Sequence, residues 1–190
     1  MERVVISGAY GEVHLEGSVA TKFISRDSSK DYISAYKEIA VSRMCTHSNI
    51  CPVRAEVTPT HFELKMPRYA TTLHARIEAG DLTPQDMCRA VVDVVAGLAA
   101  VHSIGCIHCD IKSANIFMAV DGHSVLGDFG ICSFNELKRD NNVQTTPYRA
   151  PEIRTGADPS YDTYHFTSAI DMWSVGILML EMLCSDRKSV

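Results

Sequence analysis

The amino-acid sequence predicts an α+β fold with two lobes: an N-terminal lobe made of an antiparallel sheet plus one helix, and a C-terminal lobe that is mainly helical. Three observations lead to this expectation. Short alternating segments around a glycine turn open the chain, a long amphipathic stripe follows Pro84, and a second apolar stretch surrounds Trp173. A chain of 190 residues is long enough for one core or for two small lobes that share a cleft. We expect one domain over 1–190, with lobes at 1–66 and 67–190.

The first segments predict an antiparallel hairpin. Gly-Ser at 17–18 is a dipeptide typical of two-residue turns, and such a turn places Leu15 opposite Ala20. In the same register Val13 faces Lys22, so these four side chains share one face of the sheet. The lysine then lies at the end of an apolar face.

A helix and a further strand follow the hairpin. The stretch 34–45 has no Gly or Pro and mixes apolar and charged residues at helical spacing, which predicts a helix that contains Glu38. Residues 62–66 have the composition of a strand. Pro67 is expected to stop the ladder of that strand, because proline cannot donate a backbone hydrogen bond. A hinge between the lobes is expected at this point.

Two long helices are predicted in the second half of the chain. Thr83 is a typical N-cap before Pro84, Gly105 ends the helix, and the second helix is expected over 169–182, buried around Trp173. The apolar positions of the first helix recur at helical spacing and form its predicted buried stripe: Met87, Val91, Val94, Val95, Leu98 and Val101.

Composition and charge narrow the class of protein. The chain is 46% hydrophobic and 22% charged, which is typical of a folded globular protein. Its net charge of -5 and the lack of a Lys/Arg run argue against nucleic acid as a partner. No apolar run is long enough for a signal peptide or a membrane span, and seven cysteines without paired spacing fit reduced thiols. We therefore expect a soluble, cytoplasmic protein with no membrane partner.

Several short motifs occur in a fixed order. A glycine-rich turn at 7–13 and a strand lysine precede His-Cys-Asp-Ile-Lys-Ser-Ala-Asn at 108–115, Asp-Phe-Gly at 128–130 and Ala-Pro-Glu at 150–152. This set resembles the eukaryotic-type protein kinase family over almost the whole chain. A lysine two residues after the aspartate is more similar to serine/threonine kinases than to tyrosine kinases. The resemblance implies a two-lobed protein kinase fold that phosphorylates serine or threonine in protein substrates.

The amino-acid sequences of two segments resemble those of one group within that family. Met-Pro-Arg-Tyr at 66–69 and Asp-Ile-Lys-Ser-Ala-Asn-Ile-Phe at 110–117 look most like kinases of large DNA viruses, especially herpesvirus types. That resemblance implies a viral protein in the host cytoplasm or nucleus.

The resemblance implies that ATP binds between the lobes. Gly8 and Gly11 match two of the three glycines that let the backbone approach phosphate oxygens, while Ile6 replaces the first. Lys22 matches the strand lysine that pairs with the α- and β-phosphates, and Glu38 matches the helix glutamate that holds this lysine in place.

The family's catalytic and metal-binding positions are also filled. Asp110 matches the catalytic aspartate that orients the substrate hydroxyl, and Lys112 would steady the transferring phosphoryl group. Asn115 and Asp128 would hold Mg²⁺, which prefers hard oxygen ligands.

The same alignment implies an adenine site at the hinge. Met66 takes the gatekeeper position, and the backbone groups of Pro67 and Tyr69 lie where they would bond the ring. Three apolar side chains would sandwich the adenine: Val13, Ala20 and Phe117.

The sequence departs from the family pattern at the catalytic loop. Cys109 stands where the family usually has an arginine that binds a phosphorylated activation loop. We therefore expect the segment 130–150 either to order without phosphorylation or to stay mobile. Thr145 is expected to contact Asp110 and Lys112.

A second departure is the end of the sequence at Val190, shortly after the Trp173 helix. The final helices of the usual lower lobe would then be missing, which predicts exposed apolar surface and an unpaired Glu152. A partner chain that covers this surface is one expectation, and an inactive fragment is another.

Two further alternatives compete with an active kinase. A pseudokinase or scaffold would bind nucleotide or a partner without catalysis, although the intact motif residues count against this. The spacing of Cys106, His108 and Cys109 is also compatible with a metal site, but a structural zinc site needs a second ligand pair that the sequence does not supply.

Overall fold

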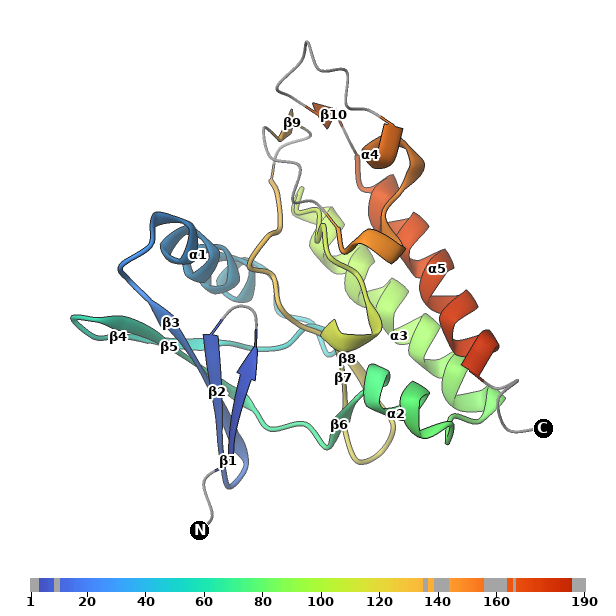
Figure 1. The fold of residues 1–190 in the computed structure, drawn as a ribbon, viewed down its shortest axis with the longest axis horizontal. Helices are drawn as coiled ribbons and strands as arrows, with labels where there is room; N and C mark the ends of the chain where they lie inside the picture. Colours follow the sequence, from blue (N-terminus) through green and yellow to red (C-terminus); the bar gives the residue numbers. More distant parts are fainter. Residues whose placement is uncertain are drawn as a thin grey trace.

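The computed structural model describes residues 4–8, 11–134, 137–138, 144–155, 164–165 and 167–185. A twisted sheet with helix α1 forms one side of the molecule, and the longer helices α3 and α5 form the other (Figure 1). The predicted α+β fold with two lobes is confirmed.

The N-terminal sheet is antiparallel and has five strands in the order β1-β2-β3-β5-β4. Their bounds are β1 Val4–Gly8, β2 Gly11–Glu16, β3 Val19–Ser25, β4 Arg54–Val57 and β5 His61–Pro67.

The predicted register of the hairpin is confirmed. Leu15 pairs with Ala20 and Val13 pairs with Lys22 across β2 and β3. Gly17 in the turn has a φ of 57°, in the left-handed region that glycine adopts without a steric cost. Lys22 therefore lies on the apolar face of the sheet, as the alternation predicted.

Strand β5 ends at Pro67, as predicted, but a hydrogen bond lost at the proline is not the reason. Pro67 pairs with Val19, and the Arg68 N–H just beyond the strand still donates to the Ser18 carbonyl at 2.8 Å. Hydrogen-bonded and non-hydrogen-bonded pairs alternate along antiparallel strands. Pro67 therefore occupies a non-hydrogen-bonded position, where the missing N–H removes no bond.

Helix α1 (Ser29–Met44) begins earlier than the predicted start at residue 34. Ser28 caps it, because its hydroxyl accepts a hydrogen bond from the Asp31 N–H at 3.4 Å. The helix packs on the sheet through a small core cluster: Ile24, Ala35, Phe62 and Leu64.

The C-terminal part contains four α-helices and short strands within the described ranges. The helices are α2 Leu73–Ala79, α3 Pro84–Ser103, α4 Pro151–Thr155 and α5 Ala169–Ser185, with 3-10 turns at Ser113–Asn115 and Thr146–Tyr148. The strands are β6 Thr71–Thr72, β7 Ile116–Met118 and β8 Ser124–Leu126, which form one sheet, and β9 Leu137–Lys138 with β10 Tyr164–His165, which form another.

The N-terminus predicted for α3 is confirmed. The Thr83 hydroxyl accepts from the Asp86 N–H at 3.1 Å, and the Asp86 carboxylate accepts from the Thr83 N–H at 3.1 Å. Of the predicted stripe, Val91 and Val95 are only partly buried at the edge of the core. Helix α2 was not predicted, although its cap, Thr72, and its terminal glycine, Gly80 with a φ of 65°, are ordinary helix signals.

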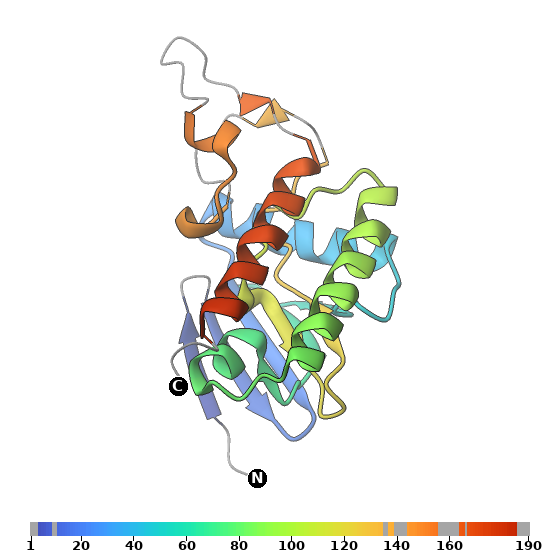
Figure 2. The same cartoon turned by 90° about the vertical axis from the view of Figure 1, so that its right-hand side faces the viewer.

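Helices α3 and α5 lie side by side and enclose the main core, as the two views in Figure 1 and Figure 2 agree. Gly97 allows α3 to approach the segment before β4, because a Cβ at this position would lie 2.8 Å from the Asn49 carbonyl oxygen. The shared core includes residues from both helices: Val94, Leu98, Val101, Val175, Leu178 and Met182.

Helix α5 is buried on one face only. Trp173 lies on the other face and is 45% exposed, so the prediction that the helix is buried around Trp173 is wrong. The exposed apolar surface predicted for this region is present. It is formed by the α5 face that consists of Met172, Trp173, Met179, Leu180 and Leu183. Glu152 is exposed. Within the described residues, no helix combines the length and the apolar character that crossing a bilayer requires.

Candidate active site

A pocket of about 470 Å³ lies between the N-terminal sheet and the C-terminal part. Most of the residues that the motifs nominated line it: Val13, Ala20, Lys22, Glu38, Met66, Pro67, Tyr69, Asn115, Phe117 and Asp128. Gly8 and Gly11 face each other where β1 and β2 join, and the residues between them lie outside the described part of the chain. The structure therefore gathers into one cavity side chains that are spread over more than half of the sequence.

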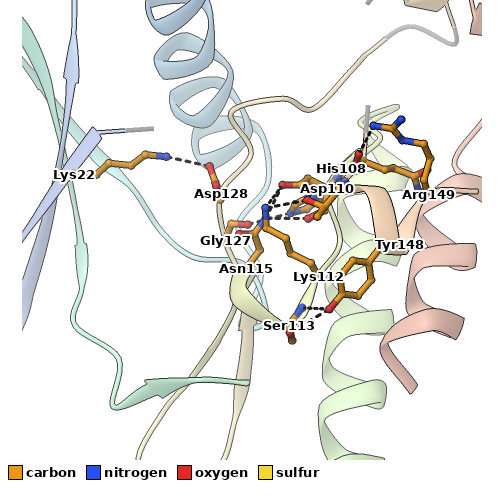
Figure 3. Close-up of polar contacts among 12 residues, drawn as sticks. Lys22, His108, Asp110, Lys112, Ser113, Asn115, Gly127, Asp128, Tyr148 and Arg149 are labelled. Carbon is orange, nitrogen blue, oxygen red and sulfur yellow. Dashed lines mark hydrogen bonds and ion pairs between the residues drawn. The ribbon is translucent and has the colours of Figure 1, made fainter. Parts of the chain in front are cut away.

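Lys22 bridges two carboxylates at the inner end of the pocket. Its Nζ lies 2.6 Å from Oε1 of Glu38 on α1 and 3.0 Å from Oδ1 of Asp128. Figure 3 shows the contact of Lys22 with Asp128. Burial alone would lower the pKa of Lys22, but the two carboxylates outweigh burial and hold the pKa above its ordinary value. Lys22 is therefore a fixed positive charge beside the cavity.

The apolar walls of the pocket come from both sides of the cleft. Val13 and Ala20 lie on the sheet, and Phe117 lies on β7. The Phe117 ring stacks on Tyr69 with 5.4 Å between ring centroids and 18° between planes. Gly127 makes room for Phe117, because a Cβ there would lie 2.2 Å from the ring. Flat apolar walls of this kind suit a planar aromatic ligand.

The hinge backbone presents hydrogen-bonding groups beside these walls. Among the described residues, the Tyr69 N–H has no backbone acceptor, whereas its neighbours Arg68 and Ala70 donate to Ser18 and Met118. Pro67 lines the pocket as well. Pro67 and Tyr69 thus both lie beside the apolar walls, where the hinge alignment expects them to bond adenine.

Asp110 lies in the loop before β7 and is 3% exposed. Its Oδ2 accepts from Lys112 Nζ at 2.7 Å, and its Oδ1 accepts from the Thr145 hydroxyl at 2.7 Å and the Thr145 N–H at 3.1 Å. The predicted contact of Thr145 with Asp110 and Lys112 is confirmed. Burial alone raises the pKa of Asp110, but the hydrogen bonds from Lys112 and Thr145 outweigh burial and hold the pKa below its ordinary value.

Asp171 on α5 supports the backbone of this loop. Its carboxylate accepts from the His108 N–H at 2.8 Å, the Cys109 N–H at 2.9 Å and the His102 ring at 2.8 Å. Cys109 has a φ of 67°, so the loop adopts a left-handed conformation at a residue other than glycine. Asp171 therefore satisfies two buried donors that have no acceptor within their own loop, which gives it a scaffold role.

Replacing Asp171 tests that support. We expect Asp171→Ala to lower the free energy of unfolding by roughly 3 kcal/mol, because two buried backbone N–H groups lose their acceptor. Urea denaturation measures the change. Asp27→Ala, at an exposed position near the end of β3, is the matched control. Equal stability of the two variants would contradict the scaffold role.

The oxygen atoms of Asn115 and Asp128 fit a magnesium ion. The Asn115 Nδ2 donates to the Asp110 carbonyl at 2.9 Å, which leaves its Oδ1 as an acceptor at the pocket. Asp128 uses Oδ1 for Lys22 and keeps its second oxygen. One amide and one carboxylate oxygen suit Mg²⁺, whose remaining ligands in such sites are water and phosphate.

The alternative metal site around Cys106 is not supported. The His108 Nδ1 accepts from the Asp110 N–H at 3.2 Å, and its Nε2 lies 3.1 Å from the Gly127 carbonyl oxygen. Cys109 Sγ donates to the Ile107 carbonyl at 3.4 Å. Within the described ranges, no group of three or more possible metal ligands lies close together. The side chains of His108 and Cys109 instead bond backbone groups.

A second cavity of about 380 Å³ adjoins Lys112 and Thr145. Ser113 Oγ donates to Glu181 Oε1 at 2.9 Å, and the Tyr148 hydroxyl also bonds Glu181. Figure 3 shows Ser113 and Tyr148 turned toward each other. Sequence reasoning missed this cluster, because no motif links Glu181 on α5 with a loop so far before it in the chain.

The two-lobed fold and the residues that line its pocket agree with the family that the comparisons give. The model of the protein kinase domain family matches residues 5–189, so the chain belongs to the protein kinase family.

Curated relatives are mitogen-activated protein kinases. Mitogen-activated protein kinase 13 of Bos taurus is 29% identical over 192 residues, which cover 93% of this chain and 50% of the relative. The Homo sapiens protein of that name is 29% identical with 51% of the relative covered, and mitogen-activated protein kinase 12 of Danio rerio is 28% identical with 51% covered. The chain thus spans about half the length of the curated relatives it matches.

Proposed function

We propose that this chain transfers the γ-phosphate of ATP to serine or threonine hydroxyls of protein substrates. The observation that carries the proposal is the placement of Lys22 and Asp128, bonded to each other, in the pocket. Asp110 lies beside the pocket, bonded to Asn115 of its lining and to Lys112. Phosphoryl transfer depends on positioning and charge neutralisation more than on covalent chemistry. A fixed cation, oxygen ligands and a buried carboxylate meet these needs.

Each residue then has one task. Lys22 binds phosphate oxygens, and Glu38 keeps the lysine in place. Asn115 and Asp128 hold magnesium, which neutralises charge on the phosphates when bound. Asp110 accepts a hydrogen bond from the substrate hydroxyl and orients it toward the γ-phosphate, since its lowered pKa keeps it ionised at neutral pH. Lys112, 2.7 Å from Asp110, adds positive charge where the phosphoryl group passes.

The proposal also covers substrate specificity, origin, compartment, partner chain and lobe boundaries. Lys112, two residues after Asp110, supports serine/threonine specificity. The Met-Pro-Arg-Tyr hinge supports a relation to kinases of large DNA viruses, with the host cytoplasm or nucleus as the compartment. The apolar α5 face supports a partner chain as its cover. The division into lobes at 1–66 and 67–190 belongs to the same proposal.

The experiment that tests the proposal is magnesium-dependent transfer of radiolabelled γ-phosphate to a mixed serine/threonine peptide library. We expect transfer with magnesium and none with EDTA. If ATP raises the melting temperature but no phosphate is transferred, the chain is a nucleotide-binding pseudokinase, and active transfer is contradicted. If ATP changes neither property, the fragment alternative holds.

Thr145 offers a test of the geometry around Asp110. Thr145→Val keeps the shape of the side chain but removes the hydroxyl that bonds Asp110 and Lys112, so we expect kcat to fall roughly 10-fold through misalignment. The pKa of Asp110 should rise, because one of the bonds that lower it is lost. The acidic limb of the kcat profile therefore moves to higher pH. Thr146→Val, at the exposed neighbouring position, is the control, and identical profiles for both variants would contradict the assignment.

A further inference from the structure

Gln144 is a buried polar residue that begins the segment 144–150, which lies in the described range 144–155. It is 4% exposed and has a φ of 62°, in the left-handed region. A residue other than glycine adopts this conformation at a cost, so other interactions must hold it there. Hydrogen bonds from both its side chain and its backbone do so.

The Gln144 amide ties the segment to helix α5. Its Nε2 donates to the Ile170 carbonyl at 2.7 Å and to the Ser174 hydroxyl at 2.7 Å. Its Oε1 accepts from the Ala150 N–H at 2.8 Å. Both amide protons and the amide oxygen are thus used, and the last of these bonds closes the segment from its first residue to its seventh.

The backbone of Gln144 binds the catalytic loop. Its N–H donates to the Cys109 carbonyl at 2.8 Å, and its carbonyl accepts from the Arg149 guanidinium at 3.1 Å. The next residue is Thr145, whose N–H and hydroxyl both bond Asp110. The position of Gln144 therefore fixes the position of the two groups that hold the Asp110 carboxylate.

Cys109 cannot supply a charged anchor for this segment. Its side chain is fully buried, and its Sγ donates to the Ile107 carbonyl at 3.4 Å. A phosphorylated side chain would need a cation such as arginine to hold it against the loop. The neutral amide of Gln144 bonds the same loop and α5 without any phosphate.

We infer that Gln144 is a positioning residue that holds Thr145 and Asp110 in the catalytic arrangement and makes transfer independent of phosphorylation in the segment 144–150. The inference rests on the proposed kinase function. In this inference the buried Gln144 orders the segment that contains Thr145, whose N–H and hydroxyl bond Asp110.

Gln144→Gly tests the inference, because glycine tolerates a φ of 62° and the change removes only the amide bonds. We expect kcat to fall roughly 10- to 100-fold through misplacement of Thr145, with KM for ATP unchanged. ATP binding should persist because Gln144 does not line the 470 Å³ pocket. Phosphatase treatment should leave the wild-type rate unchanged. Gln85→Gly, in the exposed first turn of α3, is the matched control and should retain the wild-type kcat.

Hydrogen exchange of a peptide covering 144–150 supplies a readout that needs no catalysis. We expect Gln144→Gly to lose protection there while its ATP binding stays intact. A wild-type kcat in this variant, unchanged protection, or loss of wild-type transfer after phosphatase treatment would each overturn the inference. If the wild-type chain transfers no phosphate, the proposed function fails, and the exchange comparison alone then decides whether Gln144 orders the segment.

Discussion

Asp110→Asn is expected to reduce kcat about 1,000-fold, within the range found when a positioned acid or base is removed. Asparagine has nearly the same shape and keeps an oxygen that accepts from Thr145. It lacks the negative charge that attracts the substrate hydroxyl's proton and pairs with Lys112. The loss should therefore appear in the chemical step. Single-turnover transfer with radiolabelled ATP measures it.

ATP binding should survive this substitution, because Asp110 is not among the residues that line the 470 Å³ pocket. Thermal shift with ATP and magnesium checks that point. Asp27→Asn, at an exposed position remote from the cleft, is the control and should retain full activity. Transfer by Asp110→Asn at more than a tenth of the wild-type rate would remove Asp110 from the proposed mechanism.

Lys22→Met has the second large expected effect, since it removes the cation that binds phosphate and pairs with two carboxylates. We expect kcat/KM for ATP to fall at least about 100-fold, as the loss of a preorganised charged contact does. The variant should also be less stable by about 3 kcal/mol, because the buried Glu38 loses its charged partner. Steady-state kinetics and urea denaturation measure the two effects.

Lys65→Met is the matched control for this variant. Lys65 lies on the neighbouring strand β5 and pairs with Glu56 and Glu63 at the surface. Surface ion pairs contribute little to stability, so this variant should keep both its ATP kinetics and its unfolding midpoint. Equal losses in the two lysine variants would mean that strand packing, and not the charge beside the cleft, is responsible.

The free energy of unfolding of the Lys22→Met variant should change with pH in a definite direction. Burial raises the pKa of the Glu38 carboxyl, and Lys22 is the main group that opposes this. Without Lys22, the folded variant binds a proton at Glu38 more tightly than the unfolded chain does. Its free energy of unfolding therefore falls as pH rises above the ordinary carboxyl pKa of about 4.3. The difference in melting temperature between wild type and variant should be larger at pH 8 than at pH 5.

Most of the residues nominated from the sequence line the pocket, because they belong to short contiguous motifs. Lys22 was placed by a two-residue turn that sets strand register, and the Asp-x-Lys-x-x-Asn spacing fixed Asp110 and Asn115 within a single loop. In each case a local rule determined the position of the side chain. In the structure Lys22 and Asn115 line one pocket, and Asp110 lies beside it, bonded to Asn115.

The sequence did not predict features that depend on distant partners. Gln144 attracts no attention in the sequence, because its role depends on Ile170 and Ser174 of α5. Glu181 was missed for the same reason. The end of β5 at Pro67 was predicted, but for the wrong reason, because the effect of a proline on a ladder depends on whether it falls at a hydrogen-bonded position. Only the pairing of β3 with β5 determines that.

The contact of Asp171 with the catalytic loop also bears on how the protein folds during synthesis. The strands of the N-terminal sheet pair with partners close in sequence for β1, β2 and β3, and these can form while translation continues. The amides of His108 and Cys109 find their acceptor 63 and 62 residues further along the chain. Helix α5 must therefore leave the ribosome before the loop that carries Asp110 can close, whereas β1, β2 and β3 can pair earlier.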